Sequence, residues 1–170
     1  MRLFNKCLFL TIVLHLVCSN RMVIKKVTCL SMDPEFSKFD LCQLNTKKDN
    51  RIDITLRLLK PPITKALATV QFLFGNSFKM AMINNTWDFC QFMKNRQRAS
   101  VFGRIFDYVA TYSNLNHTCP YNHDIYIRNF TLMGKNTLIA GPSGVYKISL
   151  NASINRMDRL YVSLVMAVTN

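Results

Sequence analysis

Apolar and polar side chains alternate with a period of two along much of this chain, which is the pattern of β-strands that bury one face. The alternation is clearest over residues 52–58, where isoleucine and leucine occupy every second position. Turn-forming pairs such as Asp33-Pro34 and Gly75-Asn76 separate the segments. Seven to nine short strands joined by turns predict an all-β antiparallel sandwich. The strand-like segments are residues 22–32, 36–42, 52–58, 68–74, 78–84, 124–132, 146–153 and 160–168.

The period changes after Cys90. Apolar residues then fall at i, i+3, i+4 and i+7, one stripe of an α-helix: Phe102, Ile105, Phe106 and Val109. Ser100 is placed to cap this helix, although Arg96 and Arg98 lie unfavourably near the positive end of its dipole. We therefore expect one helix inserted between Cys90 and Cys119.

The first 19 residues have the layout of a secretory signal peptide. Arg2 and Lys6 precede an apolar run over residues 8–17, and Val17 and Ser19 suit the −3 and −1 positions of a cleavage site. The alternative is an uncleaved signal anchor. No later segment has 18 uncharged apolar residues in a row. We expect a secreted, extracellular protein with a signal peptide over residues 1–19, one domain over residues 20–170 and no stable membrane span.

Four of the six cysteines follow this leader. In an oxidising compartment four cysteines permit three sets of disulfides. The pairs Cys29–Cys42 and Cys90–Cys119 are favoured, because each closes a short local loop.

The chain is strongly basic. Without the leader it keeps 20 Lys and Arg residues against nine Asp and Glu residues, a net charge near +11. This balance favours anionic partners such as lipid head groups or acidic glycans, and the secretory route argues against nucleic acid. The basic residues are scattered along the sequence, as on a solvated surface.

Four asparagines lie in N-glycosylation motifs. Asn151 is the best candidate, because its strand parity points it outward. Asn84 shares the parity of Met80 and Met82, so a glycan there needs a strand end or a bulge. The four acceptors are Asn84, Asn116, Asn129 and Asn151.

Catalytic patterns are weak. His117, Cys119 and His123 have the spacing of a metal site or of a Cys/His nucleophile pair, but a disulfide at Cys119 removes both ligand and nucleophile. Glu35 is the only glutamate, and no hydrolase or phosphate-binding motif occurs. We expect no enzyme activity, metal or cofactor.

Apolar side chains with inward parity are numerous, and the sequence has nine methionines and twelve phenylalanines. They either fill an ordinary core or line a lipid-sized cavity between two sheets, a lining that methionine and phenylalanine suit. The cavity candidates are Leu56, Leu58, Val70, Phe72, Phe74, Phe78, Met80, Met82, Phe102, Phe106, Tyr146, Ile148, Leu150, Val162, Leu164 and Met166.

Several motifs occur in order over nearly the whole chain after the leader. Together they resemble an insect-specific secreted family of unknown function that includes the CheB chemosensory proteins and looks related to the ML lipid-recognition proteins. The resemblance implies an immunoglobulin-like sandwich that opens around acyl chains or sterols, and some relatives are implicated in sensing hydrocarbon pheromones. The motifs are Cys29-x12-Cys42, Leu58–Pro62, Trp87-Asp-Phe-Cys90-x-Phe, Tyr112-Ser-Asn-x-Asn-His-Thr-Cys-Pro-Tyr-Asn-His-Asp124 and Gly144-x-Tyr146.

Two functions follow as hypotheses. The first is a secreted, non-enzymatic binding protein for a lipid, sterol or hydrocarbon, with the inserted helix near the mouth of the cavity and a possible role in chemosensory perception. The alternative is an extracellular interaction module with a filled core, which binds a membrane receptor or channel through its basic surface.

Overall fold

The computed structural model describes residues 21–47, 49–96, 100–132 and 142–169. The signal peptide expected over residues 1–19 lies outside them. In this part of the chain no helix is long and apolar enough to cross a membrane. The strands are β1 (Arg21–Ser31), β2 (Ser37–Asn45), β3 (Arg51–Leu58), β4 (Ala66–Phe74), β5 (Met80–Asp88), β6 (Ile125–Phe130), β7 (Gly144–Ile154) and β8 (Met157–Thr169).

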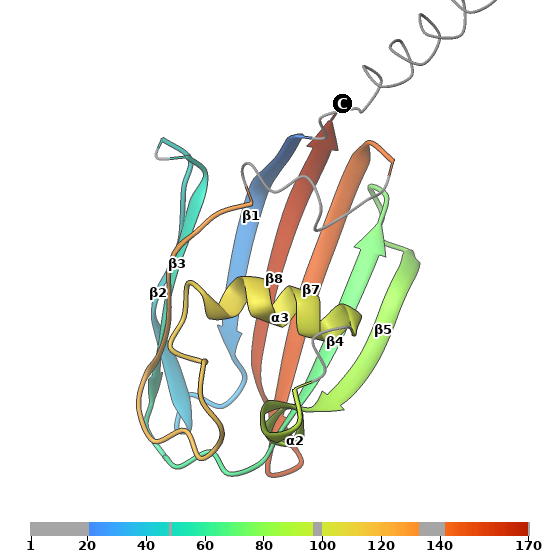
Figure 1. Cartoon of the computed structure of the whole chain (residues 1–170). Coiled ribbons are helices and arrows are strands. Elements are labelled where there is room, and N and C mark those ends of the chain that lie inside the picture. Colours follow the sequence, from blue (N-terminus) through green and yellow to red (C-terminus); the bar gives the residue numbers. More distant parts are fainter. Residues whose placement is uncertain (1–20, 48, 97–99, 133–141, 170) are drawn as a thin grey trace, which may run out of the picture.

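These strands form two sheets in which all pairings are antiparallel. The larger sheet has the order β1-β8-β7-β4-β5, and the smaller has the order β2-β3-β6. Figure 1 shows the smaller sheet beside the β1 edge of the larger one. The prediction of an all-β antiparallel sandwich is confirmed.

The disulfide Cys29–Cys42 joins the two sheets and shows which face of the larger sheet is inner. It links β1 to β2 with a Cα–Cα distance of 6.1 Å. One row of directly paired residues crosses the larger sheet at the level of Cys29, and paired residues share a face of an antiparallel sheet. That inner row is Cys29, Val162, Leu150, Val70 and Asn85.

Two helices follow β5, where the sequence predicts one. Helix α3 (Val101–Ala110) is the expected helix, and Gly103 N–H donates to the capping Ser100 Oγ at 2.9 Å. Helix α2 (Phe89–Lys94) contains Cys90 itself and is capped by Asp88. Its six residues are too few to show a helical stripe in the sequence. The second disulfide, Cys90–Cys119, ties α2 to the segment before β6 with a Cα–Cα distance of 5.5 Å, so both favoured pairings are confirmed.

Helix α3 covers part of the inner face that the smaller sheet leaves open. The helix crosses in front of the larger sheet in Figure 1. Its Phe102 packs against Ala68 and Val70 of β4. A three-stranded sheet cannot cover five strands, and this helix replaces the missing layer over β4.

The buried apolar side chains form three clusters. The first surrounds Tyr146 and Met166, both with no exposed surface, and the second surrounds Tyr121 near the opposite ends of the sheets. The third is the contact of Phe102 with β4. Half-buried side chains, among them Phe39 and Ile148, pack against two of these clusters at once. The candidate site lies on the inner face of β7 and β8, where Leu150 belongs to none of the three clusters.

Candidate ligand-binding site

Leu150 is the central residue of the site. It lies on β7, the middle strand of the larger sheet, and belongs to the inner row that faces the smaller sheet. Nevertheless 37% of its surface is exposed. A leucine at the centre of an inner sheet face is normally among the most buried residues of a sandwich.

The inner-face neighbours of Leu150 also keep contact with solvent. Ile148 beside it on β7, and Val162 and Leu164 on β8, are only half-buried. Towards the ends of the same strands Tyr146, Met166, Ile154 and Leu160 are buried. The inner face is therefore sealed at both ends and accessible in its middle.

The aromatic side chains of the helical segment form one side of this site. Trp87 stacks on Phe102 with ring centroids 4.5 Å apart, and Phe92 meets Phe102 edge-on at 4.7 Å. Phe106 contacts both Phe92 and Phe89 at 5.5 Å. These edge and stacked contacts hold α2 and α3 together, so the helical side of the site is preorganised.

The structure shows where each predicted cavity residue lies and how deeply it is buried. Five of them meet at the site itself: Val70, Ile148, Leu150, Val162 and Leu164. By burial, the half-buried set is Phe74, Phe78, Ile148, Val162 and Leu164, and the exposed set is Met80, Met82 and Leu150. The buried set is Leu56, Leu58, Val70, Phe72, Phe102, Phe106, Tyr146 and Met166.

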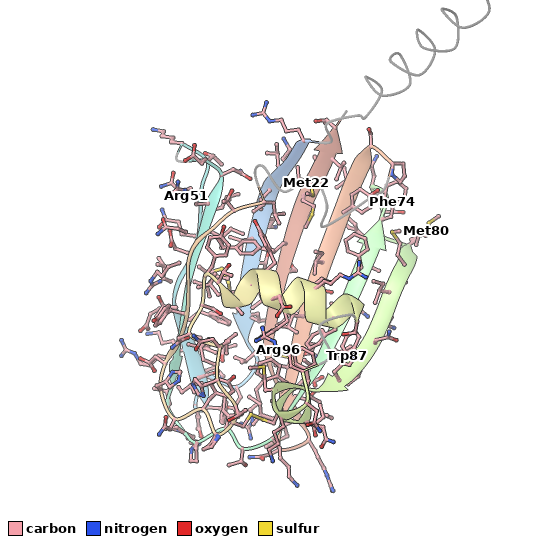
Figure 2. All side chains as sticks on the ribbon, viewed as in Figure 1. Met22, Arg51, Phe74, Met80, Trp87 and Arg96 are labelled. Atoms are coloured by element: carbon pink, nitrogen blue, oxygen red, sulfur yellow. A yellow bond between two sulfur atoms is a disulfide. The ribbon has the colours of Figure 1, made fainter. Side chains whose placement is uncertain are left out.

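The predicted cavity residues Met80 and Met82 are open to solvent at the edge of the sheet. They are 62% and 50% exposed. β5 is an edge strand, and its pairing with β4 shifts between Phe72–Ile83 and Leu73–Ala81, so that Met82 is the extra residue of a β-bulge. Figure 2 shows Met80 at the outer margin of the sheet, beyond Phe74.

Phe78 does not reach the inner face. It precedes β5 with a φ of 51°, so strand parity does not apply to it. Its ring lies 5.7 Å from Lys147 Nζ. On β7, Lys147 has the parity opposite to the inner residues Ile148 and Leu150, which places Phe78 over the outer face.

The bulge also affects the glycosylation motifs. It supplies the irregularity that a glycan on Asn84 needs, and Asn84, Asn116 and Asn129 are exposed. Asn151, the candidate favoured by parity, is half-buried, and its Oδ1 is buried without a hydrogen-bond partner among the described residues. By exposure, Asn84 is therefore a better candidate for glycosylation than Asn151, the opposite of the expectation from parity.

Residues 66–148 match the model of DUF1091, a protein family of unknown function. No curated protein matches the chain. The DUF1091 match runs from β4 through both helices and β6 to Ile148 of β7. It therefore includes the second disulfide and the helical side of the site. The family description assigns no ligand, activity or partner.

Within the DUF1091 match, the His117–Cys119–His123 group has no free thiol. Cys119 is in a disulfide, and the two imidazoles face each other with Nε2 atoms 2.7 Å apart. Across the described ranges no group of three or more His, Cys, Asp or Glu side chains is placed to hold a metal ion. The disulfide removes the only nucleophile that the sequence suggests at this position.

Arg96 is a site residue that the sequence analysis treats only as unfavourable for the helix dipole. In the structure its Nη2 lies 2.5 Å from Asp107 Oδ1, and its guanidinium lies 4.7 Å above the Phe106 ring. The pairing joins the segment after α2 to α3, and no local pattern indicates it. The aromatic partners Phe89 and Phe92 lie three residues apart on α2, a helix too short for the sequence to indicate.

A separate surface hollow lies near the start of β1. It has a volume of about 470 Å³, and its lining includes the charged residues Arg21, Lys25 and Asp49. It contains none of the predicted cavity residues.

Proposed function

We propose that this protein is a secreted, non-enzymatic carrier of a hydrophobic ligand that lies between the two sheets against the inner face of β7 and β8. The observation that carries the proposal is the exposure of Leu150 in the middle of that face. Burial of apolar surface is worth about 25 cal/mol per Å². A ligand that covered Leu150 and its half-buried neighbours would recover free energy that the empty protein does not gain.

Several features support a site that stays open. The Cys29–Cys42 disulfide fixes the distance between the sheets at one edge. The buried residues Tyr146 and Tyr121 fill the two ends of the site. The aromatic contacts of α3 fix its helical side. The two disulfides are also compatible with secretion into an oxidising compartment. Together these features would hold the two sheets around a long or flat apolar molecule.

Ligand retention tests the proposal directly. The protein is stripped by unfolding and refolded, offered an alkane, a fatty-acid ester and a sterol, and examined by native mass spectrometry. The resemblance to CheB proteins adds long-chain hydrocarbons of the pheromone type to this set. We expect at least one class to be retained at one molecule per chain.

Leu150→Trp provides the matched variant, because an indole would occupy the space beside β7. We expect it to fold and to lose the retained ligand. Leu67→Trp is the control, since Leu67 is 43% exposed and pairs with Ser153 on the outer face. Retention of no class by the wild-type protein would refute the carrier and favour the interaction module that binds a receptor or channel.

A further inference from the structure

The side chain of Arg96 carries an unusual hydrogen-bond donor. Its Nε is buried and has no hydrogen-bond partner among the residues that the structure describes. Buried donors in native proteins are almost always satisfied, and an orphan commonly marks a group that something else completes. The other end of the same guanidinium is already paired with Asp107.

Arg96 is connected to the apolar site through two phenylalanines of α3. The guanidinium lies over Phe106, which contacts Phe102, and Phe102 packs on Val70, the β4 partner of Leu150. Figure 2 places Arg96 between α3 and α2 in this view. Arg96 also acts on Tyr121. Burial raises the pKa of Tyr121 to about 12, and the positive charge of Arg96 lowers that pKa and so partly offsets the effect of burial. The guanidinium therefore lies on the helical side of the site, with Phe106 and Phe102 between it and Val70.

The charge balance restricts what this donor accepts. Asp107, which is half-buried, already neutralises Arg96. A carboxylate brought to the free N–H would meet the Asp107 carboxylate as well, and like charges in a partly buried site repel. A neutral carbonyl oxygen accepts the hydrogen bond without that repulsion.

We infer that the ligand is a long apolar molecule with a neutral carbonyl group, such as an ester or ketone, whose oxygen accepts a hydrogen bond from Arg96 Nε. The inference rests on the proposed function and refines it, because it names the chemical class of the ligand. It places the carbonyl at Arg96 beside α3 and the hydrocarbon chain along Leu150 and the inner face of β7.

Three matched probes test the inference: hexadecane, methyl hexadecanoate and hexadecanoate, each measured by displacement of a fluorescent apolar dye. In the wild-type protein we expect the ester to bind more tightly than the carboxylate. Hydration of the probes cancels when the ester-to-alkane affinity ratio is compared between variants. We expect that ratio to fall about ten-fold in Arg96→Met, the size of one charge-assisted hydrogen bond.

Arg96→Lys is the second variant, since it keeps a cation for Asp107 and lacks the N–H at the Nε position. We expect the same fall in the ratio. Arg104→Met, at an exposed arginine of α3, is the control and should leave the ratio unchanged. An unchanged ratio in both Arg96 variants, or tighter binding of the carboxylate, would overturn the inference and leave the carrier intact. If no probe displaced the dye from any variant, the carrier itself would fall.

Discussion

The carboxamide of Asn50 forms two hydrogen bonds with the backbone of Ile24. Its Oδ1 accepts from Ile24 N–H at 2.5 Å, and its Nδ2 donates to Ile24 O at 2.9 Å. The pairing of β1 with β8 shifts between Ile24 and Lys26, so the peptide groups of Ile24 lie at a β-bulge. Asn50, in the turn between β2 and β3, thus satisfies backbone groups of β1 in the other sheet, at the point where the pairing of β1 with β8 is irregular.

Replacing this carboxamide should destabilise the fold strongly. Asn50→Ala removes two hydrogen bonds and leaves buried backbone groups unpaired, which should lower the free energy of unfolding by about 2–4 kcal/mol. Asn50 also has a φ of 52°, so part of the loss is backbone strain. Asn155→Ala is the control, because Asn155 has a φ of 55° but is exposed, and it should cost only about 1–2 kcal/mol. Equal losses in urea denaturation would show that the hydrogen bonds contribute nothing.

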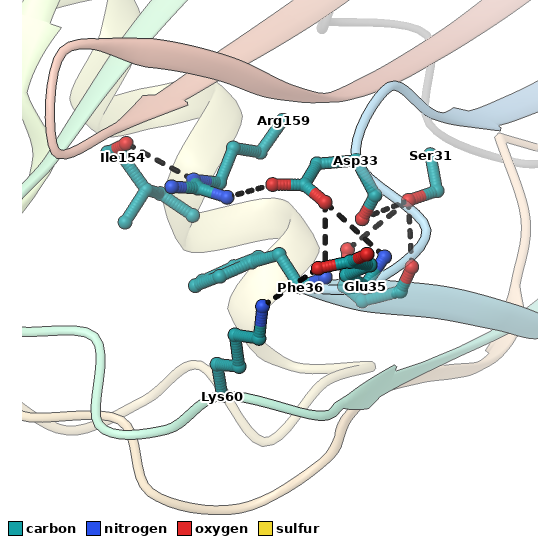
Figure 3. A network of polar contacts seen from close by, with 8 residues as sticks. Ser31, Asp33, Glu35, Phe36, Lys60, Ile154 and Arg159 are labelled. Atoms are coloured by element: carbon teal, nitrogen blue, oxygen red, sulfur yellow. Dashed lines mark hydrogen bonds and ion pairs between the residues drawn. The ribbon is translucent and has the colours of Figure 1, made fainter.

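A second prediction concerns the ion pair of Arg159 and Asp33, drawn in Figure 3. Arg159 is buried, bonds to Asp33 Oδ2, donates from Nε to Ile154 O at 3.2 Å and lies over Phe36. Asp33→Asn keeps an oxygen for the Glu35 and Phe36 amides but leaves the guanidinium without its counter-charge. We expect a loss of about 3–5 kcal/mol in the free energy of unfolding.

The same region supplies the control for this variant. Lys60 and Glu35 form an exposed pair at 3.1 Å. Lys60→Gln should change the free energy of unfolding by less than about 1 kcal/mol. If Asp33→Asn had an equally small effect, the pair with Arg159 would be contributing no more than an ordinary surface contact.

Alkaline pH should weaken the fold through two tyrosines. Burial raises the pKa of Tyr121 to about 12, and burial with the charge and hydrogen bond of Tyr112 raises the pKa of Tyr108 to about 12. From the ordinary pKa of 10.0 upward the unfolded chain binds fewer protons than the folded one, so stability is full below pH 10 and is lost as the pH rises to about 12.

Unfolding at a series of pH values measures this loss. Tyr121→Phe should reduce the dependence on pH by up to one proton, while Tyr126→Phe, at an exposed tyrosine, should leave it unchanged. Phenolate absorbance, followed in parallel, should rise for Tyr121 and Tyr108 only when the protein unfolds. Their ionisation in the intact fold at the ordinary pKa would contradict the prediction.

The sequence predicts the features that depend on local pattern. The alternation at Ile52, Ile54, Leu56 and Leu58 becomes a strand with those four residues buried, and Ser100 caps α3. Short loops also favour the two disulfides that form. In each case the information lies within a few residues or within one closed loop.

Features that depend on distant partners are not visible in the sequence. A bulge needs only one extra residue, so parity fails at Met82 although the composition of β5 is strand-like. The pairs Asn50–Ile24 and Arg159–Asp33 join positions 26 and 126 residues apart. Parity does place Leu150 on the inner face, but whether the opposite layer covers it depends on how far apart the sheets stand.

The final prediction measures whether the space beside Leu150 is filled. In Leu150→Ala the lost atoms already touch solvent, so the free energy of unfolding should fall by less than about 1 kcal/mol. Leu160→Ala removes the same atoms from a buried position on the inner face of β8 and should cost about 2–5 kcal/mol. A saturating ligand should stabilise the wild-type protein more than Leu150→Ala, because bound ligand adds to stability in proportion to the logarithm of its affinity. If both alanine variants lost the same free energy without ligand, the sheets would be packed against each other at Leu150 and would leave no room for an acyl chain.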